Sequence, residues 1–96
     1  MGAMRQSHIE RGLQNKGFAL CNKGHRRFVY WSESGKKTTV RTMTSHGADK
    51  AISAGLVAKM AGQCKLCTSD FERLVNCPLL RHEYENMLRI QGIHLD

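Results

Sequence analysis

Apolar residues in the first part of the chain change from a helical spacing to a strand-like one. Ile9 and Leu13 stand four residues apart, which predicts an amphipathic helix over about residues 5–16. Gly17 follows, and glycine commonly ends helices because it tolerates the left-handed conformation. Three runs rich in β-branched and aromatic residues then predict strands at 18–22, 26–32 and 36–44. The turns between these runs are short, so we expect an antiparallel three-stranded sheet.

The second half of the chain returns to helical spacing. Asp49 is placed to cap a helix over about residues 50–63. The segment 69–72 begins with serine and ends with glutamate, which is the pattern of a capping box at the start of another helix. Pro78 suits the first turn of a last helix, and Gly92 would end it.

This order of elements predicts an α+β fold, because a small sheet must bury one face and the helices are available to cover it. The length indicates a single domain over residues 1–96. We expect a helix, three strands and a helix over about 5–63, followed by a helical extension over 64–96. On the third strand Val40 should point inward. Alternation then exposes the other side of that strand, which carries Lys37, Thr39, Arg41 and Met43.

The second strand contains three aromatic residues, Phe28, Tyr30 and Trp31. Exposed aromatic rings can stack on unpaired bases. In so small a domain, however, Phe28 and one of the other two are expected in the core.

Charge is distributed unevenly along the chain. The net charge is +7, and residues 1–47 carry nine lysines and arginines against two acidic residues, whereas residues 48–96 carry six of each sign. The whole excess therefore lies in the first half. Clustered cations favour a polyanionic partner, because binding releases counterions from phosphates. We interpret the basic half as RNA-binding, with contacts expected from Lys23, Arg26, Arg27, Lys36, Lys37 and Arg41.

A candidate catalytic residue lies among these cations. The segment 23–28 reads Lys-Gly-His-Arg-Arg-Phe, which places His25 at the start of a strand, directly after a glycine turn. Imidazole titrates near neutral pH and can accept a proton from a ribose 2′-hydroxyl. Neighbouring cations can hold the phosphate and offset charge that develops on it. The alternative interpretation of His25 is an ordinary exposed turn histidine.

Several short motifs over about residues 5–60 resemble the HicA toxins, which are small proteins that cleave mRNA. These motifs are Gly17-Phe18, Lys23-Gly24-His25-Arg26-Arg27-Phe28, Thr38-Thr39-Val40 and Ser45-His46-Gly47. The resemblance implies a fold like that of double-stranded-RNA-binding domains, a toxin-type endoribonuclease that works without metal, and a HicB-like antitoxin as partner. It also implies that His25 is the general base and that His46 could assist it.

The chain departs from that pattern in three places. The family has Gly-Ser before the histidine, where this chain has Lys23-Gly24. The proline before the second histidine is replaced by Ser45, and the chain continues for two helical segments beyond a typical member. Two other functions therefore stay open: a non-catalytic RNA-binding module, and an interaction protein of a mobile element whose basic face meets an acidic protein.

Metal binding is a competing interpretation of the cysteines. Cys64, Cys67, Cys77 and His82 could supply four zinc ligands, but the second pair lacks a regular zinc spacing, and buried free cysteine is common. We therefore expect no metal and no cofactor. No apolar run approaches the roughly 20 residues of a membrane span. A cytoplasmic protein without a membrane partner is the expectation.

Overall fold

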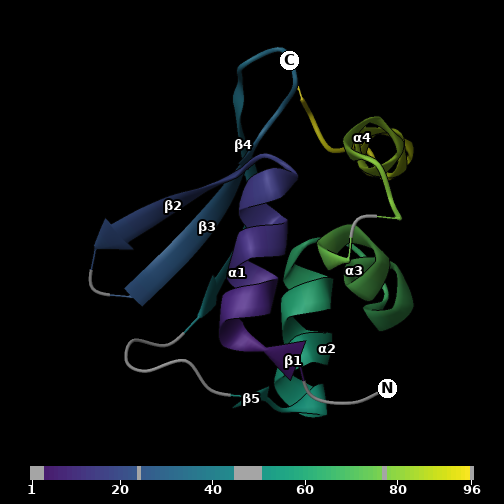
Figure 1. Ribbon diagram of the computed structural model, residues 1–96. Helices are drawn as coiled ribbons and strands as arrows, with labels where there is room; N and C mark the ends of the chain where they lie inside the picture. Colours follow the sequence, from purple (N-terminus) through teal and green to yellow (C-terminus); the bar gives the residue numbers. More distant parts are fainter. Residues whose placement is uncertain (1–3, 24, 45–50, 77, 96) are drawn as a thin grey trace.

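The computed structural model describes residues 4–23, 25–44, 51–76 and 78–95, without the side chains of Asn22, Lys23 and His25. Helix α1 (Gln6–Asn15) precedes three strands, β2 (Phe18–Lys23), β3 (His25–Trp31) and β4 (Lys37–Thr44) (Figure 1). Helices α2 (Ala54–Gln63), α3 (Thr68–Val75) and α4 (Arg81–Ile90) follow, and the short strands β1 (Met4–Arg5) and β5 (Ala51–Ile52) pair with each other. The predicted α+β fold is confirmed.

The three longer strands form the expected antiparallel sheet in the order β2-β3-β4. Along β4 the residues alternate strictly between exposed and buried, with Val40 inward, as predicted. The sheet also decides the orientation of β3, which the sequence left open. Phe28 and Tyr30 are fully buried, whereas Trp31 is 40% exposed on the other side.

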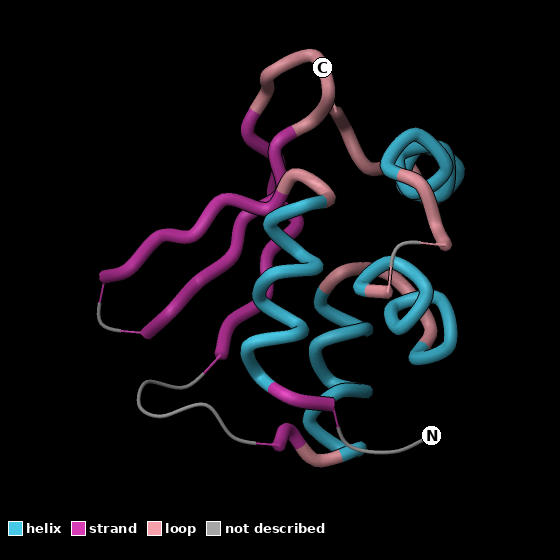
Figure 2. The backbone as a smooth tube through the Cα atoms, in the orientation of Figure 1, coloured by secondary structure: helices cyan, strands magenta, loops and turns pink. Residues whose placement is uncertain are grey.

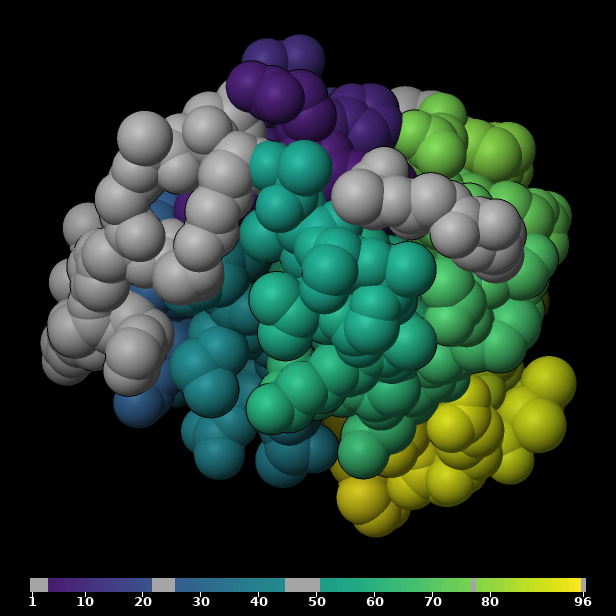
Figure 3. Space-filling model, turned by 90° about the horizontal axis from the view of Figure 1, so that it is seen from below, coloured from purple at the N-terminus to yellow at the C-terminus, as the bar shows by residue number. Residues whose placement is uncertain are grey.

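Helices α1 and α2 lie against one face of this sheet, and α3 packs on these two helices (Figure 2). Helix α1 packs on β2 and α3, and α2 packs on β4 and α3. Seen from below, α2 forms the centre of the surface, with α3 beside it and α4 further along (Figure 3). Apolar residues from α1, the sheet and all three later helices join one buried core.

Helix α4 reaches this core through Tyr84. Its ring lies 5.2 Å from that of Tyr30 and 6.0 Å from that of Phe18, between ring centroids. Such aromatic pairs add attraction beyond the area that they bury. The helical extension therefore completes the cover of the sheet's inner face.

A close approach of two helices fixes α1 against α3. A Cβ atom placed on Gly12 would lie 2.5 Å from the carbonyl oxygen of Val75, so only glycine fits there. Nearby, the buried ammonium of Lys16 donates to the carbonyl oxygen of Leu74 at 2.8 Å, in the last turn of α3. This bond satisfies a carbonyl group that the helix itself leaves unpaired.

Helix ends are confirmed at two glycines, but the helix starts differ from those expected. Gly17 and Gly92 adopt positive φ angles of 103° and 82° just after α1 and α4. The helix expected from residue 50 begins only at Ala54, because Ala51–Ile52 is extended and paired with Met4–Arg5. Its cap is Ser53, which accepts from the Leu56 amide, whereas Asp49 lies outside the described residues.

The other two helix starts are corrected in the same way. Helix α3 is preceded by Cys67 as its N-cap residue, so Ser69 lies inside the helix and caps nothing. Helix α4 begins three residues after Pro78, where the Glu83 carboxylate accepts from the Leu80 amide at 2.9 Å. A carboxylate at the third helical position is well placed to satisfy this free amide. No helix within the described ranges is long and apolar enough to cross a membrane.

Candidate nucleic-acid interface

Arg26 and Arg27 lie on opposite faces of the sheet because side chains alternate along β3. Arg26 points to the helical side and forms two bonds with Glu10 of α1, from Nη2 at 2.9 Å and from Nε at 3.1 Å. Arg27 is exposed on the other side. The guanidinium of Arg26 is occupied within the fold, so we leave this residue out of the candidate interface.

Glu10 is the centre of a polar cluster on the covered side. Besides Arg26, its carboxylate accepts bonds from Thr44 Oγ1 at 2.7 Å and Gln6 Nε2 at 3.1 Å. Burial alone would raise the pKa of Glu10, but the hydrogen bonds and the positive charge of Arg26 outweigh it and hold the pKa below its ordinary value. This cluster ties α1 to β3 and β4.

The outer face of the sheet carries the remaining cations. We call it the basic face, and its exposed residues include Trp31 and the cations Arg27, Lys37 and Arg41. The strand register places Lys37 opposite Trp31 and Arg41 opposite Val29, which is two residues from Arg27 on the same face of β3. Cross-strand neighbours on one face lie within reach of the same ligand. Lys36 is also exposed, at the turn directly before β4.

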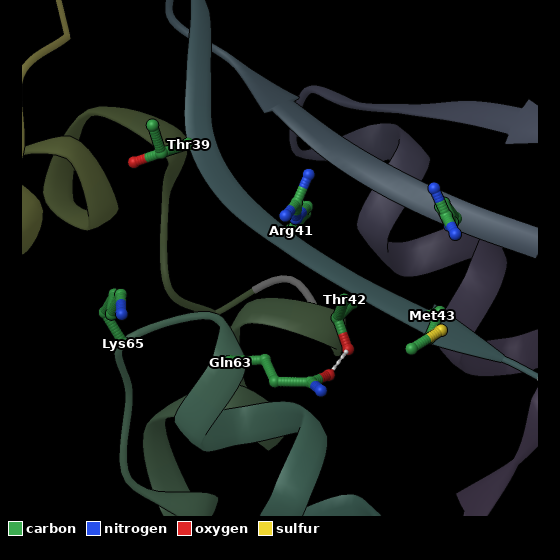
Figure 4. A pocket seen from close by; sticks show the side chains of 7 residues that line it. Thr39, Arg41, Thr42, Met43, Gln63 and Lys65 are labelled. Carbon is green, nitrogen blue, oxygen red and sulfur yellow. Dashed lines mark hydrogen bonds between the residues drawn. The ribbon is translucent and has the colours of Figure 1, made fainter.

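Two hollows share this face and meet at Arg27 and Arg41. One, of about 330 Å³, extends over β2 and β3 to Lys37 and Trp31. The other, of about 350 Å³, lies between β4 and the end of α2 and is lined by Gln63 and Lys65 as well (Figure 4). The lining residues that the structure describes include no aspartate or glutamate in either hollow. The local charge is therefore strongly positive.

Lys65 is a site residue that the sequence reasoning missed. It belongs to the half of the chain without a charge excess, and it joins the basic face only because α2 packs on β4. No local signal in the sequence indicates this position. A residue directly after a helix that approaches a strand can be placed only from the tertiary structure.

The structure places His25 and Lys23 at the hairpin end of β2 and β3, where they pair with each other through the backbone. Their side chains lie outside the description, and so does His46. The backbone of His25 stands two residues before Arg27 on the same strand. The catalytic assignment of His25, with His46 as helper, stays a prediction.

The zinc interpretation gains no support from the described ligands. Cys64 is fully buried at the end of α2, where burial raises the pKa of its thiol and so disfavours the thiolate that zinc requires. Cys67 and His82 are exposed, and Cys77 lies outside the described residues. Among the residues that are described, no group of three candidate ligands comes together.

A second polar cluster lies beneath the basic face and joins the sheet to α4. The carboxylate of Glu85, only 2% exposed, accepts from the Tyr30 hydroxyl at 2.6 Å and from the Glu33 amide at 2.7 Å. Arg89 donates to its other oxygen at 3.2 Å. Burial, followed by the bond to Glu85, raises the pKa of the Tyr30 hydroxyl, so this group stays protonated and acts as a donor. The cluster is structural, because its two central residues, Tyr30 and Glu85, are buried.

Comparisons with known proteins return no match: no family model, no curated protein and no solved structure is similar to this chain. The resemblance to HicA toxins therefore stays a prediction based on the motifs.

Proposed function

We propose that this protein binds RNA on the basic face of its sheet. The observation that carries the proposal is the convergence of Arg27, Lys37 and Arg41 on one exposed face, away from the acidic residues of the helices. Positive side chains on adjacent strands can contact successive phosphates. An acidic protein is the competing partner for such a surface.

An exposed aromatic ring favours single-stranded RNA over both duplex RNA and an acidic protein. Trp31 is 40% exposed and lies opposite Lys37 in the sheet. Unpaired bases can stack on such a ring while nearby cations hold the backbone, and this combination is typical of single-strand binding. A duplex keeps its bases stacked inside and offers Trp31 no partner.

The proposal can be tested by fluorescence anisotropy with a labelled oligouridine at several salt concentrations. Arg41→Ala should weaken binding and lower the slope of log affinity against log salt by about 0.7, the value for one phosphate contact on a single strand. Arg73→Ala is the control, since Arg73 lies on α3 and pairs with Asp70. Equal affinities for Arg41→Ala and the wild type would remove the basic face from the interaction.

Trp31→Ala provides a second arm of the same experiment. We expect a loss of roughly 1–3 kcal/mol in binding to oligouridine, because base stacking on an aromatic ring is lost. Binding to a duplex of equal length should change little. A larger loss with the duplex would contradict the preference for single strands.

Cleavage of the bound RNA is the second candidate function, and the position of His25 at the start of β3 favours it. As a general base, the imidazole would take the proton of a ribose 2′-hydroxyl, whose oxygen then attacks the adjacent phosphorus. The bond from phosphorus to the 5′-oxygen of the next nucleotide breaks, this oxygen takes up a proton from water, and a 2′,3′-cyclic phosphate remains. Arg27 would offset negative charge on the phosphate. In this form the protein acts as a toxin-type endoribonuclease on mRNA, with a HicB-like antitoxin as partner.

A cleavage assay with EDTA present separates the two functions. RNA should be cut by the wild type and not by His25→Ala, while both bind it. His82→Ala is a matched control, because His82 is an exposed histidine at the start of α4. Binding without cleavage by the wild type would leave an RNA-binding protein without the catalytic function.

A further inference from the structure

Three cations from three different elements surround the hollow between β4 and the end of α2. Arg27 comes from β3, Arg41 from β4, and Lys65 from the turn after α2. We infer that this hollow is a binding site for the phosphate of one nucleotide, an inference that deepens the proposed function by giving the RNA a defined anchoring point. The proposal names Lys65 as a ligand-binding residue.

The turn at Lys65 is fixed by its backbone conformation and hydrogen bonds, so the Cα atom from which the side chain extends has a defined position. The residue has a φ angle of 65°, a left-handed conformation that normally favours glycine. The Lys65 amide donates to the Gly62 carbonyl at 3.0 Å, and the Leu66 amide donates to the Ala61 carbonyl at 2.9 Å. The Lys65 carbonyl accepts from Gln91 of the chain segment after α4 at 2.8 Å. A lysine here occupies a place where glycine would fit the backbone better.

The remaining lining groups suit a nucleotide. Thr42 Oγ1 donates to Gln63 Oε1 at 2.6 Å, which uses the oxygen of the amide and leaves its Nε2 donor for a ligand (Figure 4). Thr39, on the exposed face of β4 and so opposite to the buried Thr42, adds a hydroxyl to the lining. Met43 is 46% exposed and lines the same hollow, so it offers apolar surface to a base or sugar.

The size and charge of the hollow agree with this ligand. Its volume of about 350 Å³ lies at the lower end of the roughly 300–1,000 Å³ of small-molecule pockets, which suits one nucleotide rather than a larger cofactor. With three cations and no acidic residue among its described lining, the hollow can offset both charges of a terminal phosphate or the single charge of an internal one. The phosphate can thus come from RNA or from a free nucleotide.

Lys65→Gly tests the site without disturbing the turn, because glycine adopts the left-handed conformation freely. The wild type and this variant are compared for oligouridine binding by anisotropy, with Arg73→Ala as control. Arg73 is an exposed arginine of α3 that pairs with Asp70. We expect Lys65→Gly to weaken binding roughly five- to tenfold and to lower the salt slope by about 0.7. Arg73→Ala should match the wild type.

A second measurement tests ligand binding in the hollow in the absence of RNA. Titration with uridine 5′-monophosphate should shift the amide resonances of Thr39, Gln63 and Lys65, whereas uridine should not. If these shifts occur but the protein binds no RNA, the hollow is a nucleotide site and the proposed function is wrong. If RNA binding depends on Arg41 but not on Lys65, and no shifts occur, the hollow is not a nucleotide site but the proposed function stands.

Discussion

Arg26 and Arg27 follow each other in β3, yet the first pairs with Glu10 inside the fold at 2.9 Å and the second is exposed on the basic face. Two adjacent arginines of equal charge thus serve different purposes. A charge reversal of both together would combine a folding effect with a binding effect, so they have to be changed one at a time.

For Arg27→Ala we expect RNA affinity to fall roughly fivefold with unchanged stability, because one exposed phosphate contact is lost. For Arg26→Ala we expect the free energy of unfolding to fall by about 1–2 kcal/mol, because a partly buried, doubly hydrogen-bonded ion pair is broken. Urea unfolding and RNA anisotropy on both variants check this assignment. A stability loss confined to Arg27→Ala would contradict it.

The pH dependence of stability should contain a contribution from Glu10. Its pKa is lower in the folded protein than the ordinary value of 4.5, so ionised Glu10 stabilises the fold above that value. This contribution disappears as the pH falls from there through the lowered pKa. Glu10→Gln should therefore lose less stability than the wild type between neutral and acidic pH. If the free energy of unfolding, measured with urea, falls by the same amount with pH in both proteins, Glu10 does not contribute.

Replacing glycine by alanine should have opposite effects on stability at the contact of α1 with α3 and at an open position of α2. Gly12→Ala should cost about 1–3 kcal/mol or more, because the new Cβ atom would meet the Val75 backbone at 2.5–2.8 Å and one helix must move. Gly62→Ala is the control: it lies in α2 with no atom within 4 Å of the new Cβ, and alanine favours helix by up to about 1 kcal/mol. Thermal unfolding should show a lower melting temperature for Gly12→Ala and an equal or higher one for Gly62→Ala than for the wild type.

The bond between Tyr30 and Glu85 can be measured by a double-mutant cycle. Tyr30→Phe removes the hydroxyl donor and should cost about 1 kcal/mol. Glu85→Ala leaves the proton of the Tyr30 hydroxyl and the Glu33 amide without an acceptor and should cost more, about 2–4 kcal/mol. The double variant should lose less than the sum, by about 0.5 kcal/mol or more. Strict additivity in urea unfolding would mean that the two groups do not interact.

The sequence allowed the elements of the sheet and the exposed side of β4 to be predicted, since alternation along a strand is a local pattern. It could not decide which side of β3 is buried, because each side carries an arginine. The buried side carries Arg26, whose charge is paired by Glu10 only after α1 packs on the sheet. The start of α2 was missed for a similar reason, since β5 forms by pairing with residues that lie far away in the chain.

The residues of the candidate site also differ in whether the sequence could reveal them. Lys37 and Arg41 could be found from charge and strand periodicity, and Arg27 from charge alone. Lys65 could not, because its place beside Arg41 results from the packing of α2 on β4 and from a left-handed turn that no glycine marks. Contacts between distant segments carry no signature in the composition of either one.

Tyr84 and Glu85 give the segment after residue 63 a role that its position in the chain does not suggest. They close the sheet's inner side against Phe18 and Tyr30. A fragment cut at that point would expose two large rings and an unpaired hydroxyl to water, and such a surface promotes aggregation. The extension thus supplies the part of the apolar cover that α1 and α2 leave open, and with it only the basic face of the sheet meets solvent.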